Sequence, residues 1–540
     1  MTSSSQVIVV GTGVVGSVIA EHCLDAGLEV LMIEAGPRVS RAQIVENYRN
    51  LPLGAKPDAT ASYPPADWAP HPFHGLEHLE STGPNKYDPT YIRYAGGSTW
   101  HWAGTSWRLT PEDMQLRSRY GVGRDWAFDY ETIDPYYNMT ERKLGICGPA
   151  DPADQWPVRT RSMPYPMPHL PLSQGERKFT EVMRDKLGLR NVPVAQARNS
   201  GMPYDDRPAC CANNNCVPVC PVGAKYDAAT SLNRLEAKGA TILENSVVYR
   251  VETGEGNRIV AVHYYDRDKT SHRVTGEHFV IACNGVETPR LMLMSADDRN
   301  PNGLANSSDQ VGRNMMDHPQ QGYTFTTVEP YWLGAGPVVN SGIMETSQGD
   351  FRADHAAVYF RLNNFARNRD IAKRAMSSGK VGRALDEEIR RLTATSLNVV
   401  AAFEMLPDPN NRLTLSAQKD WLGLPRPSVY WDVGDYVRRS SAEYSNPLAQ
   451  RIAEAVGATD FKPASPEKFS TSKHIMGGTI MGNDPATSVV DRHSRTHDHA
   501  NLYLPGGGAM ASTACGNSTI TMTAMAFMAA EALVSEAKGA

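Results

Sequence analysis

Four cysteines lie within eleven residues in the segment CCANNNCVPVCP, at positions Cys210, Cys211, Cys216 and Cys220. Thiolates at such short spacing are soft metal ligands, and a closing Cys-Pro pair is typical of ferredoxin ligand runs. Zinc also binds thiolates, but structural zinc sites usually use paired C-x₂₋₄-C knuckles. The other four cysteines are scattered singly, which argues against a disulfide framework in a chain of 540 residues. The segment therefore favours an iron–sulfur cluster, with zinc and disulfides as the alternatives.

The N-terminal segment QVIVVGTGVVGSVIAEHCLDAGLEVLMIEAGPR predicts a nucleotide site. Apolar runs at 7–10 and 30–33 predict buried parallel strands on either side of a helix over 17–26. Glu34 closes the second strand, about 20 residues beyond the turn, where an acid binds a ribose hydroxyl. Glycines in the G-x-G-x-x-G pattern permit a tight turn, close approach of a pyrophosphate and close helix packing, and they are Gly11, Gly13 and Gly16. These features together predict a bound dinucleotide, and the continuation EAGPR is more typical of FAD enzymes than of NAD enzymes.

Composition excludes some partners and locations. Residues are 41% apolar and 21% charged, as in globular proteins, and the net charge of −5 offers no basic surface for nucleic acid. The start MTSSSQVIVVG lacks the basic and apolar regions of a signal peptide. The longest apolar tract, TITMTAMAFMAAEALV, is shorter than the roughly 20 residues of a membrane span and contains Glu531. We therefore expect no signal peptide and no transmembrane segment, and we interpret the tract as a buried helix.

Motifs along nearly the whole chain resemble the glucose-methanol-choline (GMC) family of flavin oxidoreductases. In chain order they are AGGSTWHWAGTSWR (95–108), NGVETPRLMLMS (284–295), VGRNMMDHP (311–319), KHIMGGTIMG, NLYLPGGGAM and GNSTITMTAMAFMAAEAL. The cysteine segment is similar to that of catalytic flavoprotein subunits in bacterial membrane-associated dehydrogenases of fructose, glucose, sorbitol and gluconate. Soluble oxidases of the family generally lack such a cluster.

The resemblance implies a Rossmann-like α/β domain for FAD, assembled from discontinuous segments, and a substrate domain built on an antiparallel sheet. We assign 1–115, 205–325 and 465–540 to the FAD-binding domain, with the iron–sulfur segment at 205–226. The intervening 116–204 and 326–464 are assigned to the connection and the substrate-binding domain.

The resemblance also implies the reacting groups. His474, in HIMGGT, matches the family's catalytic base, and histidine suits this role because its ordinary pKa lies near neutrality. Asn517 matches the second active-site position and would bind the substrate oxygen. His101 aligns with a histidine that some members join covalently to the flavin. Lys473 stands where relatives carry asparagine; it either points to solvent or faces the pocket and attracts the carboxylate of a sugar acid.

The remaining assignments follow from the same resemblance. The residues expected to bind FAD are Gly11, Gly13, Val14, Val15, Gly16, Glu34, Ala35, Arg93, Gly96, Gly97, Thr99, His101, Trp102, Ala103, Val248, Ala282, Asn284, Gly508, Asn517 and Thr519. The implied 3Fe-4S cluster needs three ligands, which we expect to be Cys216, Cys220 and one of the vicinal pair, with Cys211 favoured over Cys210.

The implied reaction is oxidation of a hydroxyl in a sugar, polyol or aldonic acid by hydride transfer to FAD. Single electrons would then pass through the cluster to a multihaem cytochrome c subunit. A small signal-bearing subunit would accompany the chain to the periplasmic face of the inner membrane. Two alternatives remain at this point: a soluble alcohol or sugar oxidase that uses oxygen, and an electron-transfer flavoprotein without alcohol chemistry.

Overall fold

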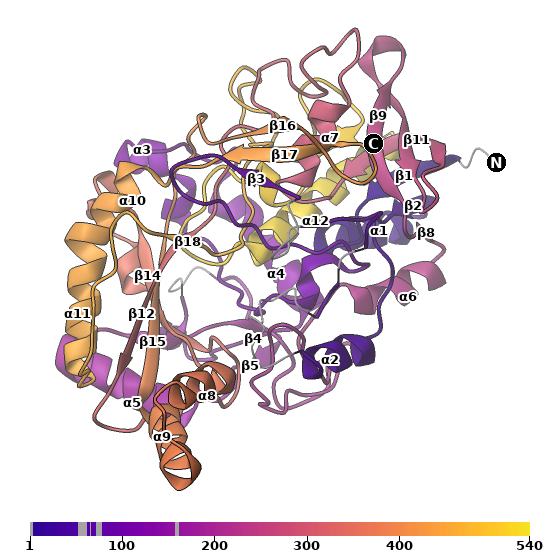
Figure 1. Cartoon of the computed structure of the whole chain (residues 1–540). Coiled ribbons are helices and arrows are strands. Elements are labelled where there is room, and N and C mark those ends of the chain that lie inside the picture. Colours follow the sequence, from indigo (N-terminus) through magenta and orange to yellow (C-terminus); the bar gives the residue numbers. More distant parts are fainter. Residues whose placement is uncertain (1–3, 52–61, 65, 72–77, 157–160, 540) are drawn as a thin grey trace.

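The computed structural model describes residues 4–51, 62–64, 66–71, 78–156 and 161–539. Two large sheets organise this part of the chain, one near the N-terminus and one beside helices α10 (Gly434–Ser440) and α11 (Asn446–Ala455) (Figure 1). The predicted α/β plus antiparallel β architecture is confirmed.

The first sheet contains the predicted nucleotide-binding unit. Its strand order is β8-β2-β1-β11-β10-β9, and β19 pairs with β11. The strands are β1 (Ser4–Val10), β2 (Val30–Ile33), β8 (Thr241–Leu243), β9 (Val247–Thr253), β10 (Ile259–Tyr265), β11 (Ser271–Ile281) and β19 (Leu502–Tyr503). β1 is parallel to β2 and β11 on its two sides, and its apolar run at 7–10 is fully buried, as the continuous β-branched sequence predicts.

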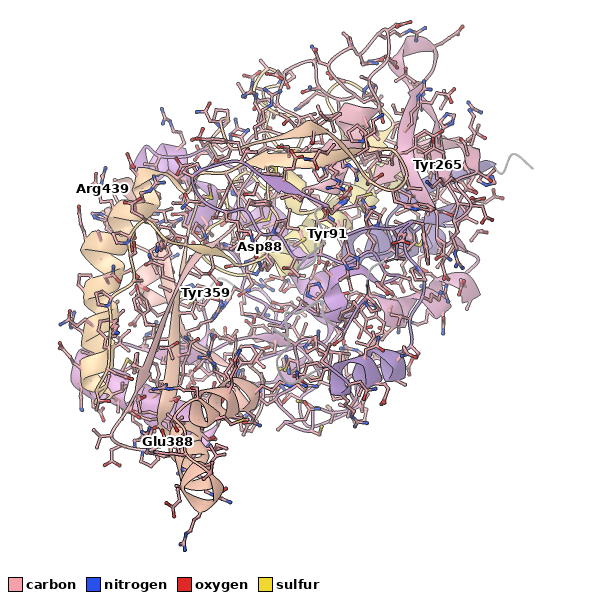
Figure 2. All side chains as sticks on the ribbon, in the orientation of Figure 1. Asp88, Tyr91, Tyr265, Tyr359, Glu388 and Arg439 are labelled. Atoms are coloured by element: carbon pink, nitrogen blue, oxygen red, sulfur yellow. The ribbon has the colours of Figure 1, made fainter. Side chains whose placement is uncertain are left out.

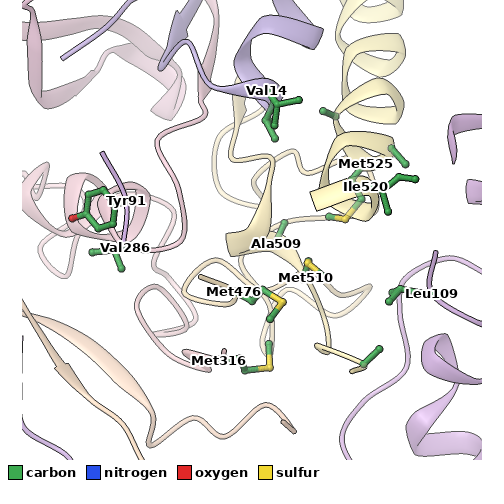
Figure 3. Close-up of a cluster of buried hydrophobic side chains, with 14 of the residues drawn as sticks. Val14, Tyr91, Leu109, Val286, Met316, Met476, Ala509, Met510, Ile520 and Met525 are labelled. Atoms are coloured by element: carbon green, nitrogen blue, oxygen red, sulfur yellow. The ribbon is translucent and has the colours of Figure 1, made fainter. Parts of the chain in front are cut away.

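Helix α12 (Thr519–Ala537) is the central helix of this domain. It packs on α1 (Val14–Asp25) and α4 (Tyr130–Leu144). By length and composition α12 could cross a membrane, but 61% of its apolar stretch is buried inside the protein. Ile520 and Met525 near its start join a cluster that includes Met316, Met476 and Met510 (Figure 3). The predicted buried helix is therefore a core helix.

The second sheet has the order β18-β12-β15-β14-β13-β6 and is antiparallel throughout. Its strands are β6 (Asn191–Pro193), β12 (Pro319–Thr326), β13 (Ser341–Ile343), β14 (Val358–Leu362), β15 (Ser396–Phe403) and β18 (Ser470–Thr471). β14 and β15 lie within 326–464, the range assigned to the substrate-binding domain. The boundary predicted at 325 falls inside β12, whose residues 319–326 pair within this sheet.

Smaller elements complete the described chain. The other strands are β3 (Glu80–Ser81), β4 (Ile146–Gly148), β5 (Met167–Pro168), β7 (Gln196–Ala197), β16 (Arg412–Lys419) and β17 (Pro425–Tyr430). The other helices are α2 (Arg41–Arg49), α3 (Leu116–Tyr120), α5 (Gln174–Val182), α6 (Ala229–Ala237), α7 (Glu287–Met294), α8 (Asn368–Met376), α9 (Gly382–Thr395), α10 (Gly434–Ser440) and α11 (Asn446–Ala455). The charged helix α9 projects from the body, as expected of a solvated helix (Figures 1 and 2).

Candidate active site

A cavity of about 450 Å³ joins the predicted nucleotide motif to the predicted reacting residues. One end is lined by the β1–α1 turn and Glu34, and the other by His474, Asn517 and side chains of the second sheet. Because the C-terminal segment contributes to both ends, chain segments far apart in sequence meet around one elongated space.

Glycines at the nucleotide end keep the backbone close and the α1 terminus open. Gly11 has φ +103°, and a Cβ there would lie 2.6 Å from the carbonyl oxygen of Ala282 on the neighbouring strand. A Cβ on Gly16 would lie 2.1 Å from the oxygen of Gly11, so this glycine permits helix packing. Gly13 is the N-cap of α1 and offers no side-chain cap, which leaves the first N–H groups available to an anion.

Glu34 is held at the cavity wall by the turn itself. Its Oε2 accepts hydrogen bonds from the hydroxyl and the amide of Thr12, at 2.6 and 3.0 Å. Burial raises the pKa of Glu34 despite these donors. These bonds hold the Glu34 carboxylate in the cavity wall, where it could accept a hydrogen bond from a ribose hydroxyl.

The loop that follows Arg93 approaches this motif from the opposite side. The amide of Gly96 donates to the Thr12 hydroxyl at 3.1 Å, and a Cβ on Gly97 would lie 3.1 Å from the Cα of Gly13. His101 lines the cavity, burial lowers its pKa to about 3, and its Nε2 has no hydrogen-bond partner. An orphaned ring nitrogen in the cavity wall, together with the glycine cradle, fits a bound flavin dinucleotide.

Most residues predicted to bind FAD line this one cavity, and three do not. Gly16, Gly96 and Gly508 are absent from the wall. Each permits a close contact instead: a Cβ on Gly96 would lie 2.6 Å from the amide nitrogen of Ala229, and one on Gly508 would lie 2.5 Å from Oγ1 of Thr479. These three glycines allow close packing of the segments around the cavity but do not line the cavity themselves.

The predicted reacting residues meet at the other end. Nε2 of His474 lies 2.9 Å from Nδ2 of Asn517, and Oδ1 of Asn517 accepts from the Tyr359 hydroxyl at 3.4 Å. Burial, with added repulsion from the Arg361 guanidinium, lowers the pKa of His474 well below its usual value. His474 is therefore neutral at neutral pH and can take a proton from a hydroxyl that Asn517 holds.

Two cations line this end of the cavity, and their surroundings differ. The ammonium of Lys473, which was predicted either to point to solvent or to face the pocket, lies 2.5 Å from the carbonyl oxygen of Asp88 and 3.0 Å from its carboxylate. Asp88 (labelled in Figure 2) therefore neutralises the Lys473 charge at the cavity wall. Arg361 donates to the Tyr359 hydroxyl at 2.6 Å and to Oδ1 of Asn363 at 3.2 Å. No carboxylate among the described residues forms a salt bridge with Arg361. Arg361 is the better candidate for binding an anionic group of a substrate.

The cysteine segment reaches the same cavity through Val217, which lines its wall. All eight cysteines are free, so the disulfide alternative is not observed. A tetrahedral zinc ion with Zn–S bonds of about 2.3 Å would hold sulfurs about 3.8 Å apart. In the described chain, the one group of three or more candidate ligands within 4.8 Å of one another is Asp317, His318 and His474, so the cysteines do not match a zinc site.

Buried cations surround these cysteines. Arg198 donates from Nη1 to the Sγ of Cys216 at 2.8 Å and from Nη2 to the carbonyl of Ala103 in the flavin-side loop at 2.7 Å. Burial alone would raise the pKa of Cys216, but the charge and hydrogen bond of Arg198 outweigh it and lower that pKa. Lys225 is also buried, which lowers its pKa to about 7, and it donates to the carbonyls of Thr99, Trp100 and Trp102.

Sequence and structure comparisons identify the family. Sequence profiles described as GMC oxidoreductase match residues 7–320 and 407–526. The chain belongs to the GMC oxidoreductase family. It is 48% identical to the fructose dehydrogenase large subunit of Gluconobacter japonicus, over 99% of each chain. It is 22% identical to the gluconate 2-dehydrogenase flavoprotein of Pantoea cypripedii, over 97% of this chain and 93% of that one.

Solved structures agree on the fold of this GMC oxidoreductase. Pyridoxine 4-oxidase from Mesorbium loti superposes with a TM-score of 0.66 at 18% identity, covering 98% of this chain and 99% of that one. A formate oxidase superposes with a TM-score of 0.68 at 13% identity, covering 100% and 99%. The protein is an FAD-dependent oxidoreductase that acts on CH–OH groups, and FAD when bound supplies the hydride acceptor.

Several residues of the site were not predicted from the sequence. They are Thr12, which orients Glu34, His318, which contacts His474, Tyr359, which donates to Asn517, and the cavity side chains Gln320, Arg361, Asn363 and Phe365. His318 lies in the quoted VGRNMMDHP motif, so a signal was present there. The β14 residues carry no motif, and only the pairing of β14 in the second sheet brings them to the cavity.

Proposed function

We propose that this GMC oxidoreductase is a dehydrogenase of a sugar, polyol or aldonic acid. The observation that carries the proposal is the contact of His474 with Asn517 at the end of the FAD cavity, among side chains rich in hydrogen-bonding groups. The pair would hold a substrate hydroxyl, with its proton passing to His474 and its carbon-bound hydrogen to the flavin. The dehydrogenase activities named for the two sequence relatives act on fructose and gluconate, which supports this substrate class.

We further propose that electrons leave through a three-iron cluster held by the cysteine segment. The donor set fits such a group: Cys216 and Cys220 are buried, and the positive charges of Arg198 and Lys225 would offset thiolates. Ligands of different iron atoms need not lie as close together as the ligands of one zinc ion. The charge of Arg198 interacts with Cys216, Cys210 and Cys220, whereas Cys211 is exposed. This arrangement favours Cys210 as the third ligand, the reverse of the sequence-based preference.

The electron acceptor and the location belong to the same proposal. A cluster beside the flavin is useful where a two-electron donor must supply a carrier that accepts one electron at a time. A multihaem cytochrome c subunit, with a small signal-bearing subunit, would place the enzyme at the periplasmic face of the inner membrane. The name of the relative from Gluconobacter, a large subunit, supports a hetero-oligomer.

A substrate panel under argon tests this function. Purified enzyme is mixed with fructose, glucose, sorbitol, gluconate and 2-ketogluconate, and bleaching of the flavin absorbance is recorded. We expect one of these compounds to bleach the flavin, and reoxidation by a cytochrome c or one-electron dye to be faster than by oxygen. Rapid formation of hydrogen peroxide in air would support the oxidase alternative. If no compound bleaches the flavin, the electron-transfer alternative is favoured.

A further inference from the structure

His318 is a buried histidine outside the predicted catalytic pair, yet it contacts the base directly. Its Nδ1 lies 2.7 Å from Nδ1 of His474, and its Nε2 lies 3.1 Å from the carbonyl oxygen of Thr513. We propose that His318 is a positioning residue that keeps the proton of His474 on Nδ1, so that Nε2 is the atom that accepts the substrate proton. The inference rests on the proposed function of His474 as the base.

The proton of His318 is assigned by its carbonyl partner. A carbonyl oxygen only accepts hydrogen bonds, so Nε2 of His318 must carry a proton to bond Thr513. His318 is completely buried, and burial lowers its pKa to about 4. A neutral imidazole carries one ring proton, which leaves Nδ1 of His318 as an acceptor.

The contact between the two rings then assigns the proton of His474. Two nitrogens 2.7 Å apart share one hydrogen, and Nδ1 of His318 has none to give. The hydrogen therefore belongs to Nδ1 of His474. Because His474 is neutral as well, its Nε2 carries a lone pair and no proton.

The other side of His474 leads to the same assignment independently. The Arg361 guanidinium is only a donor, and it donates to the Tyr359 oxygen at 2.6 Å. The Tyr359 proton is thus available to Oδ1 of Asn517, at 3.4 Å, and this orients the Asn517 amide with Nδ2 toward Nε2 of His474. An amide nitrogen only donates, so Nε2 of His474 must accept.

These contacts form one directed chain. It starts at a donor that cannot accept, Arg361, and ends at an acceptor that cannot donate, Thr513. Every hydrogen bond between them has a single allowed direction, so the tautomer of His474 is set from both ends. Asp317 fixes the two rings relative to each other, because its Oδ1 accepts the backbone amides of His318 and His474 at 2.6 and 3.2 Å.

The chain has a consequence for the reaction. With a substrate hydroxyl held by Asn517 and His474, its proton would move to Nε2, and bound FAD would supply the acceptor for the carbon-bound hydrogen and its electron pair, which leaves a carbonyl. The resulting imidazolium keeps its Nδ1 hydrogen bond to His318, which stabilises the charge. The other charged groups near His474 are Asp317, Arg361 and Lys473.

The test compares two replacements of His318 by anaerobic flavin reduction with the substrate found in the panel. His318→Leu removes the acceptor, and we expect the rate to fall about 100-fold, the upper part of the range for residues that orient a metal-bound histidine. His318→Asn places an amide oxygen near the former Nδ1, and we expect its rate to stay within about tenfold of wild type. His169→Leu is the matched control, because His169 also bonds a backbone carbonyl, that of Val194 at 3.0 Å, but does not line the cavity.

A pH profile separates positioning from a general structural effect. Without the His318 acceptor the His474 imidazolium loses a hydrogen bond, so the pKa of the base falls. The acidic limb of the reduction rate should move to lower pH in His318→Leu and stay in place in His318→Asn and His169→Leu. Loss of folding or of FAD would lower the rate of flavin reduction without shifting the acidic limb of its pH profile in His318→Leu alone.

Direct observation of the tautomer keeps the inference testable without a substrate. In wild-type protein labelled with ¹⁵N-histidine, the His474 signals, assigned by their absence in His474→Asn, should report a proton on Nδ1 and none on Nε2. A proton on Nε2 in wild type, an unchanged rate in His318→Leu, or an equal loss in both His318 variants overturns the inference. Failure of every sugar to reduce the wild-type flavin would instead overturn the proposed function, and the NMR result would still decide the tautomer.

Discussion

The guanidinium of Arg198 connects the two halves of the proposed electron path, because it donates both to Sγ of Cys216 and to the carbonyl of Ala103 beside the flavin site. No carboxylate forms a salt bridge with this buried arginine in the part of the chain that the structure describes. A buried cation needs a compensating charge, and thiolates of a metal cluster would supply it.

Single cysteine replacements test the ligand set. We expect Cys216→Ser, Cys220→Ser and Cys210→Ser each to lose iron and acid-labile sulfide, because each removes one of the three proposed ligands. Cys211→Ser is the matched control and should keep both, since Cys211 is exposed and lies outside the set that interacts with Arg198. Iron and sulfide analysis, with electron paramagnetic resonance, provides the measurement. Loss of iron in Cys211→Ser with retention in Cys210→Ser would restore the sequence-based preference for Cys211.

Replacing the base separates chemistry from cofactor binding. His474→Ala should lower the anaerobic rate of flavin reduction by about 10²- to 10⁴-fold, the range for loss of a general base. FAD content should remain near wild type, because the glycine turn and Glu34 lie at the far end of the cavity. Stopped-flow absorbance gives the rate, and the flavin-to-protein ratio gives the control. A rate within threefold of wild type would exclude His474 as the base.

The sequence predicted the nucleotide-binding half of the site better than the substrate-binding half, for a physical reason. Phosphate and ribose recognition depends on backbone geometry close in sequence, so Gly11, Gly13 and Glu34 could be recognised from their spacing. Strand β14 brings Arg361 to the cavity wall and Tyr359 to Asn517 only through its pairing with β13 and β15. Such long-range pairing leaves no local pattern in the sequence.

The same distinction explains why the sequence places a domain boundary at 325, inside β12. The segment before β12 carries the family motif that holds His318, which suggested that the FAD-binding domain extended through it. β12 itself pairs with β15 over seven residue pairs, from Gln320–Ala402 to Thr326–Ser396. A motif can therefore end at a domain junction, with the next strand already part of the other sheet.

The two cations at the substrate end should differ in their effect on substrate binding. Arg361→Gln should raise the KM for an aldonate by about 10- to 100-fold, because a hydrogen bond to a charged group contributes about 1.5–3 kcal/mol. For a neutral sugar the same change should cost about two- to tenfold. Lys473→Gln is the matched comparison and should change either KM less, since Asp88 already holds the ammonium. Steady-state kinetics with both substrate types provides the measurement, and a larger effect of Lys473→Gln on the aldonate would reverse the assignment.

Buried histidines should make the folded protein sensitive to acid. Burial lowers the pKa of His71 and His101 to about 3 and that of His169 and His318 to about 4. Unfolding returns each ring to its usual pKa near 6.5, so the unfolded chain binds more protons between pH 6.5 and 4. The free energy of unfolding is therefore unaffected by these histidines above pH 6.5, where they are neutral in both states, and it decreases as the pH falls from 6.5 toward 4.

One variant isolates a single proton from this effect. His169→Gln removes one titrating group outside the cavity, so the free energy of unfolding should depend on pH less steeply, by up to about 1.4 kcal/mol per pH unit between pH 6.5 and 4.5. Thermal and urea unfolding of wild type and variant at matched pH values provides the comparison. Above pH 7.5 the two profiles should run in parallel, because His169 is neutral in both the folded and the unfolded state there. An equally steep acid dependence in the variant would show that His169 takes up no proton on unfolding.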